Sequence, residues 1–116
     1  MKENKFKFYI YILECGDGSY YIGFTQNLFS RIKYHCKGEG ASYTRKRMPV
    51  KLILYLEFSN RYDALYIEKK LKGWSRNKKK AFVSGDFEML KALSKNLHHK
   101  NNCLKIYIPD QITNYM

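Results

Sequence analysis

Residues 8–24 read FYIYILECGDGSYYIGF, and the expected fold grows from this segment. In its first half, aliphatic and aromatic side chains alternate with period two, which places Tyr9 and Tyr11 on one face of a predicted β-strand. The run Gly16–Ser19 is typical of a tight turn, and Tyr20–Phe24 supplies a second short strand. The segment therefore predicts an antiparallel hairpin whose two tyrosine clusters lie side by side.

Beyond the hairpin, segments with helical spacing alternate with apolar runs, which predicts helices alternating with strands. Leu28, Ile32 and His35 recur one turn apart, which predicts a helix with Thr25 or Asn27 as its N-cap. The remaining segments are expected to be a polar, basic loop over 37–50, a central strand over 51–58, a helix capped by Ser59 or Asn60 with a buried stripe at 64, 65, 67, 71 and 74, a short basic helix over 75–83, a last helix beginning at Gly85-Asp86, and a strand over 104–108.

Length and composition predict one self-sufficient domain with a polyanionic partner. The chain has 116 residues, 45% of them hydrophobic and 16% aromatic, which is enough for a core without disulfide or metal staples. Its 22 Lys and Arg against 10 Asp and Glu give a net charge of +12. This charge suits nucleic acid, an anionic membrane surface or an acidic protein, so the choice must come from motifs.

Targeting signals and cysteine usage indicate a cytoplasmic protein. No apolar run approaches the roughly 18 residues of a membrane span, and the N-terminus leads into strand residues instead of a signal peptide. Cys15, Cys36 and Cys103 are odd in number and widely spaced, which favours a reducing compartment. His98-His99 with Cys103 is read as part of a solvated tail, because this grouping lacks the spacing of a zinc site.

A set of side chains along the chain is suited to cutting a phosphodiester bond. Two strand tyrosines, Tyr11 and Tyr21, could activate a water, while Arg31 could hold a phosphate in two places through its planar guanidinium. His35 lies one helical turn after Arg31 on the same face. Glu68, in the middle of a predicted helix, could bind a hard divalent ion together with substrate oxygens and waters. Taken singly, each has an ordinary structural explanation, as packing, a solvated face or an ion pair.

The ordered set resembles the GIY-YIG nuclease superfamily, in particular its small stand-alone bacterial members, from about residue 8 to 97. Tyr9-Ile10-Tyr11 is similar to the first signature with tyrosine in place of the glycine, and Tyr21-Ile22-Gly23 matches the second in full. Arg31, His35 and Glu68 follow in the family's order. Five matches in order are far more specific than any one alone.

The resemblance implies an α+β fold with a small three-stranded antiparallel sheet flanked by helices. It also implies roles: Tyr11 as base, Tyr21 assisting, Arg31 and His35 on the phosphate, and Glu68 on one Mg²⁺ or Mn²⁺ ion. Many members carry a late active-site asparagine, for which Asn77 is the nearest candidate although its surroundings differ. Residues 1–97 would form the endonuclease-like domain, and residues 98–116 an extension without a counterpart.

These observations predict a metal-dependent endonuclease that acts on DNA, with RNA left open as a substrate. Basic clusters would position the phosphate backbone without reading sequence. The expected nucleic-acid contacts are Tyr43, Thr44, Arg45, Lys46, Arg47, Lys72, Arg76 and Lys79. Two alternatives remain: a nucleic-acid-binding module with weak or no cleavage, and a basic subunit of a DNA repair or processing complex whose protein partner delivers the substrate.

Overall fold

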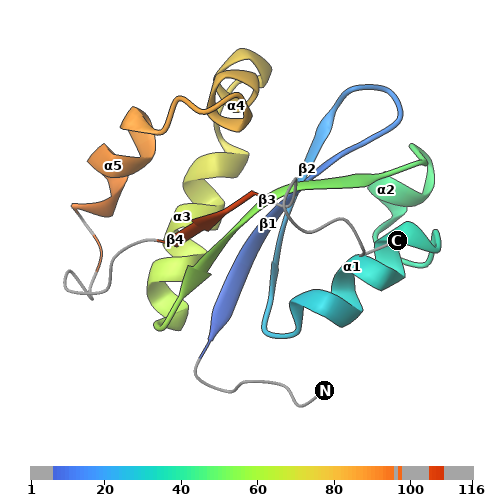
Figure 1. Cartoon of the computed structure of the whole chain (residues 1–116), viewed down its shortest axis with the longest axis horizontal. Coiled ribbons are helices and arrows are strands. Elements are labelled where there is room, and N and C mark those ends of the chain that lie inside the picture. The colour runs from blue at the N-terminus through green and yellow to red at the C-terminus, as the bar shows by residue number, and fades with distance from the viewer. Residues whose placement is uncertain (1–6, 96, 98–104, 109–116) are drawn as a thin grey trace.

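A computed structural model describes residues 7–95, 97 and 105–108 and confirms the α+β class (Figure 1). In chain order its elements are β1 (Phe8–Glu14), β2 (Tyr20–Thr25), α1 (Leu28–Cys36), α2 (Ser42–Arg45), β3 (Lys51–Phe58), α3 (Arg61–Lys72), α4 (Arg76–Val83), α5 (Glu88–Ser94) and β4 (Lys105–Tyr107).

The sheet is antiparallel throughout and has the order β2-β1-β3-β4. The predicted hairpin is present, with Tyr11 of β1 opposite Gly23 of β2 on one side and opposite Tyr55 of β3 on the other. Within the described residues the sheet has four strands, where the resemblance implied three. The added strand is β4, which pairs with β3 and so satisfies backbone groups that would otherwise form an open edge.

Helices cover both faces of the sheet, which explains why β3 is apolar almost throughout (Figure 1). One core lies beneath α3, α4 and α5 and includes Ile10 and Ile12 of β1. The other lies on the α1 side and includes Tyr11 and Leu13 from the same strand. Alternation along β1 thus sends the predicted catalytic tyrosine to the α1 side.

The helix starts follow local capping chemistry. The side chain of Asn27 accepts a hydrogen bond from the Ser30 N–H and caps α1, whereas Thr25 accepts from the Asn27 N–H just outside the helix. Asn60, and not Ser59, caps α3 in the same way. The last predicted helix is present as α5 but begins at Glu88, later than Gly85-Asp86.

Residues 37–50 differ from the predicted polar loop because they contain the one-turn helix α2. The Thr44 hydroxyl donates to the Ala41 carbonyl over 2.9 Å, and the Arg47 guanidinium donates to the Tyr43 carbonyl over 3.1 Å. Arg47 also pairs with Asp17 in the β1–β2 turn at 3.1 Å. The two local hydrogen bonds stabilise the turn, and the Arg47–Asp17 pair, thirty residues apart in the sequence, holds it beside the hairpin.

Candidate active site

The tyrosine of the first signature packs across the glycine of the second. Tyr11 is buried, with 2% of its surface exposed, and its ring lies directly against Gly23. A Cβ atom at position 23 would overlap the Tyr11 Cζ and Oη atoms and would lie 2.8 Å from Cε1. The glycine is therefore required by the position of the Tyr11 ring, in agreement with the close backbone approach expected of a glycine inside a strand.

A hydrogen-bonded chain runs from Tyr11 through His35 to Thr44. The Tyr11 hydroxyl lies 2.9 Å from His35 Nε2, and His35 Nδ1 lies 2.9 Å from Thr44 Oγ1. The single Thr44 hydroxyl proton is donated to the Ala41 carbonyl, so Thr44 Oγ1 must accept from a protonated His35 Nδ1. His35 Nε2 is then the acceptor, and Tyr11 donates its hydroxyl proton to it.

Burial keeps both the Tyr11 phenol and the His35 imidazole neutral. It raises the pKa of the Tyr11 phenol, as do the neighbouring Tyr21 and Glu68, while the Arg31 charge lowers it. Burial, together with the charge of the Arg31 guanidinium, also lowers the pKa of His35 from 6.5 to about 4. The rings of Tyr11, Tyr21 and His35 lie within contact distance of one another, and Arg31 borders the same hollow as His35 and Tyr21, so the structure brings four of the five predicted site residues together.

This histidine predicts an acid-dependent loss of stability. An unfolded histidine binds a proton below about pH 6.5, whereas buried His35 binds one only below about pH 4. The free energy of unfolding is therefore highest above pH 6.5 and falls as the pH drops from 6.5 to 4, because the unfolded state takes up the proton first. We expect urea unfolding to show a loss on the order of 2–3 kcal/mol across the window. The His35→Gln variant should lack this component, and parallel pH curves for the two proteins would contradict the prediction.

The Tyr21 ring stacks on Tyr43 of α2 and also contacts the His35 ring. Its ring centroid lies 5.3 Å from that of His35 and 6.1 Å from that of Tyr43. The Arg47 guanidinium lies over the Tyr43 ring, 3.8 Å from its centroid. Residues 43, 44 and 47, which we name the α2 buttress, thus support two of the predicted catalytic side chains.

The buttress changes the interpretation of three residues predicted to contact nucleic acid. Thr44 is fully buried at 0% exposure and its hydroxyl faces His35, so the prediction that it contacts a phosphate is wrong in this structure. Tyr43 and Arg47 are half-buried and contact other parts of the protein. Sequence reasoning missed this role because it depends on the distant partners His35, Tyr21 and Asp17.

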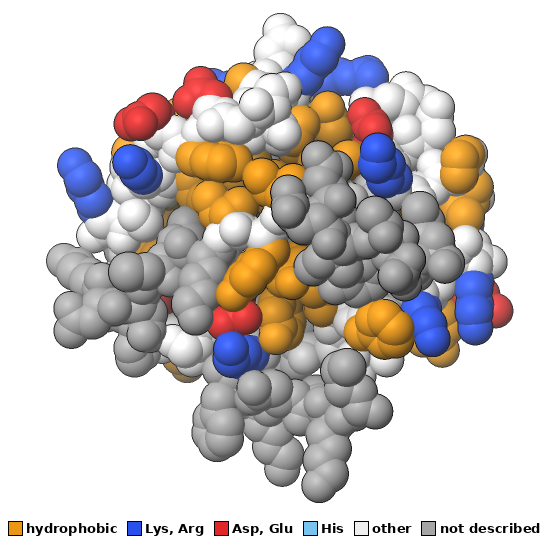
Figure 2. All heavy atoms as spheres, in the orientation of Figure 1, with side chains coloured by type: hydrophobic (Ala, Val, Ile, Leu, Met, Phe, Trp, Pro, Cys, Tyr) orange, Lys and Arg blue, Asp and Glu red, His pale blue; other side chains and the backbone are white. Residues whose placement is uncertain are grey.

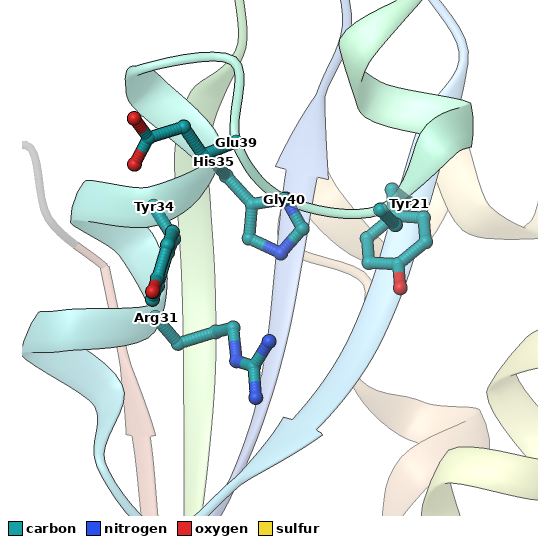
Figure 3. Close-up of a pocket in the computed structure, with 7 residues that line it drawn as sticks. Tyr21, Arg31, Tyr34, His35, Glu39 and Gly40 are labelled. Carbon is teal, nitrogen blue, oxygen red and sulfur yellow. The ribbon is translucent and has the colours of Figure 1, made fainter.

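A hollow of about 440 Å³ opens beside these groups. Arg31 and His35 from α1 and Tyr21 from β2 face one another across it (Figure 3). Its other lining residues are Tyr34, Glu39, Gly40 and Ala41. The exposed guanidinium and the phenol hydroxyl therefore border a space that a phosphate group could enter.

Gly40 was not recognised from the sequence. A Cβ atom there would overlap His35 Nδ1 and would lie 2.7 Å from Cε1 and 2.9 Å from Cγ. The imidazole thus packs against bare backbone on this side while Thr44 holds its Nδ1–H. In the sequence Gly40 looks like an ordinary loop glycine, and only the folded position of His35 distinguishes it.

Glu68 lies on α3, and 16% of its side chain is exposed. Its carboxylate forms an ion pair with Lys72 one turn later, at 3.1 Å. Its negative charge contributes to the raised pKa of Tyr11, although α3 packs on the opposite face of the sheet from α1. Glu68 is therefore on the far side of the sheet from α1 and is not among the residues that line the hollow.

Residues 7–81 match the GIY-YIG catalytic domain, more than half of the chain. This chain belongs to the GIY-YIG catalytic domain family. A UPF0213 protein of Streptococcus pneumoniae is 47% identical over 78 residues, which cover 67% of this chain and 79% of that protein. A UPF0213 protein of Halalkalibacterium halodurans is 44% identical over 89 residues, covering 74% of this chain and 95% of the relative.

A solved relative supports the fold of this GIY-YIG chain. The solution NMR structure of the protein EF2693 from E. faecalis has 35% sequence identity and a TM-score of 0.50, covering 84% of this chain and 97% of that one. The resemblance to small bacterial GIY-YIG proteins is thereby confirmed. It establishes a nuclease superfamily, while the names of these relatives specify no substrate.

The residues of the GIY-YIG site fit a metal ion that the substrate helps to bind. Within the described part of the chain, no three His, Cys, Asp or Glu side chains gather as a metal site. Mg²⁺ nevertheless binds through one carboxylate when phosphate oxygens and waters complete its shell. Glu68 fits this arrangement. His98, His99 and Cys103 lie outside the described residues.

The other basic residues predicted to contact nucleic acid lie at the surface of the GIY-YIG domain. Arg45, Lys46, Lys72 and Arg76 are exposed and Lys79 is half-buried. On the face drawn in Figure 2, Lys and Arg side chains lie around the rim of a hydrophobic centre. Asn77 is exposed on α4.

No helix in the described ranges has the length and apolar character needed to span a membrane.

Proposed function

We propose that the protein is a metal-dependent endonuclease that hydrolyses DNA phosphodiester bonds. The observation that carries this proposal is the directed chain Tyr11 to His35 to Thr44, whose middle member, His35, lines a hollow that Arg31 also borders. In such a chain His35 Nε2 can accept the proton of the weakly acidic Tyr11 phenol. Family membership supports a phosphodiester as the bond that is cut.

In this proposal, Tyr11 and His35 act together as the general base. The Tyr11 O–H bond is directed at His35 Nε2, so the oxygen lone pairs remain to accept a proton from water. As the phenol oxygen receives that proton, its own proton moves to Nε2, and no free phenolate has to form in a buried setting that raises the pKa of Tyr11. Tyr21, within stacking distance of both rings, assists by bordering the water's position.

In this proposal Arg31 binds the phosphate, and the negative charge of the bound phosphate raises the low pKa of His35. The nearby guanidinium contributes to a His35 pKa of about 4. A phosphodiester bound to Arg31 offsets that positive charge, which favours the protonated imidazole. His35 therefore becomes a better proton acceptor once substrate is present. When bound at Glu68, a divalent ion would stabilise negative charge on the reacting phosphate.

The decisive experiment is cleavage of labelled single-stranded, duplex, nicked and branched DNA, with Mg²⁺ or Mn²⁺ and with chelator. We expect cleavage that requires the metal and that falls by about 10²–10³-fold in Glu68→Gln. Lys70→Gln, two positions later on α3, is the matched control and should leave the rate within a few-fold. Cleavage that is unaffected by chelator or by Glu68→Gln would contradict the proposal.

A nucleic-acid-binding module is the second candidate, and the Glu68–Lys72 ion pair favours it. Lys72 Nζ lies 3.1 Å from the carboxylate that the metal needs, so it competes with a cation for that oxygen. A binding module would hold DNA with strong salt dependence, because its affinity would come from phosphate contacts. It would cut none of the substrates with either metal.

Thr44 is expected to act on the rate through the tautomer of His35. In Thr44→Val the Nδ1–H loses its acceptor, and the imidazole can carry its proton on Nε2, where it can no longer accept from Tyr11. We expect cleavage to fall by about 10–100-fold. Nitrogen NMR of the imidazole should show a larger Nε2–H fraction. Thr44→Ser retains the hydroxyl and should restore both the rate and the wild-type tautomer, whereas equal rates in Thr44→Val and wild type would exclude this role.

A further inference from the structure

A second hollow adjoins the catalytic one and has no role in the chemistry described above. It encloses about 350 Å³, within the range of small-ligand sites. Its lining residues are Phe24, Thr25, Gln26, Asn27, Ser30, Arg31 and Tyr34. Arg31 and Tyr34 also line the catalytic hollow, so the two hollows meet at these two side chains, which form the shared ridge.

The exposed ring of Tyr34 is the distinctive part of this ridge. It lies three residues after Arg31 on α1 and is 52% exposed. Figure 3 shows Tyr34 beside Arg31 at the border of the catalytic hollow. An aromatic face open to solvent next to a phosphate-binding guanidinium is an arrangement on which a nucleobase can stack.

We propose that the second hollow receives the nucleobase attached next to the scissile phosphate and that this base stacks on Tyr34. The inference rests on the proposed function, because it takes Arg31 as the group that binds the phosphate. A nucleotide covalently joined to that phosphate must lie beside Arg31. The catalytic hollow holds the reacting groups on one side, which leaves the second hollow for the neighbouring base.

The lining favours a base over a second phosphate. Arg31 is the single cationic side chain among the seven lining residues, and it is already assigned to the scissile phosphate. The others are aromatic or uncharged polar residues, a composition that suits stacking on a base better than binding a second phosphate. The base must be unstacked from its neighbours, whether it comes from a single strand or is drawn out of a duplex.

The test compares two oligonucleotides of equal length and charge in metal-free buffer, one of thymidine nucleotides and one with an abasic backbone. Binding is measured by fluorescence anisotropy with the full chain. We expect wild type to bind the base-bearing strand about tenfold more tightly than the abasic strand. Tyr34→Ala should lose about this factor on the base-bearing strand and nothing on the abasic strand. Because both strands lack a preferred register, the comparison does not depend on where the protein binds.

Two control variants separate stacking from other effects. Tyr34→Phe keeps the ring and should bind as wild type does. Tyr62→Ala removes a tyrosine that is 71% exposed on α3 and lines neither hollow, so it should leave the preference for base-bearing DNA intact. Equal losses on both strands in Tyr34→Ala, no loss on either, or no preference in wild type would each overturn the subsite. The cleavage panel decides the nuclease proposal separately, since cleavage with intact base discrimination in Tyr34→Ala would exclude the subsite alone.

Discussion

Replacing Tyr11 by phenylalanine is expected to reduce metal-dependent cleavage by about 10³-fold or more while DNA affinity stays near that of wild type. The substitution removes one oxygen, and with it both the proton acceptor for water and the donor to His35 Nε2. The ring that packs against Gly23 remains. We expect only about 1 kcal/mol of lost stability from the missing hydrogen bond.

The matched control is Tyr9→Phe, two positions earlier on the same face of β1. Tyr9 packs edge-on against Tyr55 at 6.0 Å and does not line the hollow beside Arg31 and His35, so we expect its hydroxyl to be dispensable for cleavage. Rates should be measured at saturating DNA, with binding measured separately. If Tyr11→Phe retained more than about a tenth of the wild-type rate, His35 would have to act on water directly and the proposed proton path would be wrong.

The parts of the fold that depend on local chemistry could be predicted from the sequence. The β1–β2 hairpin follows from alternation and a Gly-Asp-Gly-Ser turn, and Asn60 caps α3 through its own side chain. By contrast, α2 depends on Arg47 reaching Asp17, thirty residues away in the hairpin turn. A pattern within a short window contains no signal of such a contact, and so the segment was expected to be a loop.

The candidate site shows the same division. Motif order singled out Tyr11, Tyr21, Arg31, His35 and Glu68, and the structure brings the first four together while Glu68 lies on α3 and pairs with Lys72. The direction of the Tyr11–His35 hydrogen bond could not be predicted, because it is set by Thr44, whose hydroxyl proton is already used by the Ala41 carbonyl. The sequence suggested that Tyr11 could act as a base but gave no destination for its own proton.

Gly23→Ala is expected to be nearly as harmful to cleavage as the loss of the Tyr11 hydroxyl, and more harmful to the fold. The new methyl group would overlap the Tyr11 Cζ and Oη atoms, so the ring must move away from β2. Because the ring is buried against the α1-side core, that movement overpacks the interior, at a cost of about 1–3 kcal/mol. It also breaks the 2.9 Å contact with His35. Urea unfolding and cleavage rates would measure the two effects.

Gly73→Ala is the control for an ordinary glycine substitution. Position 73 has φ −81° and its added Cβ would lie 3.5 Å or more from its nearest neighbours, so stability should change by less than about 1 kcal/mol.

The steric cause can be isolated with the double variant Gly23→Ala/Tyr11→Leu. The shorter leucine lacks the atoms that the methyl group meets, so the two substitutions should couple, and the alanine should cost less stability in the leucine background than in wild type. Additive losses would show that Gly23 matters for the strand itself and not for the tyrosine. Cleavage should remain absent in the double variant, because relieving the overlap restores packing but not the hydroxyl that donates to His35.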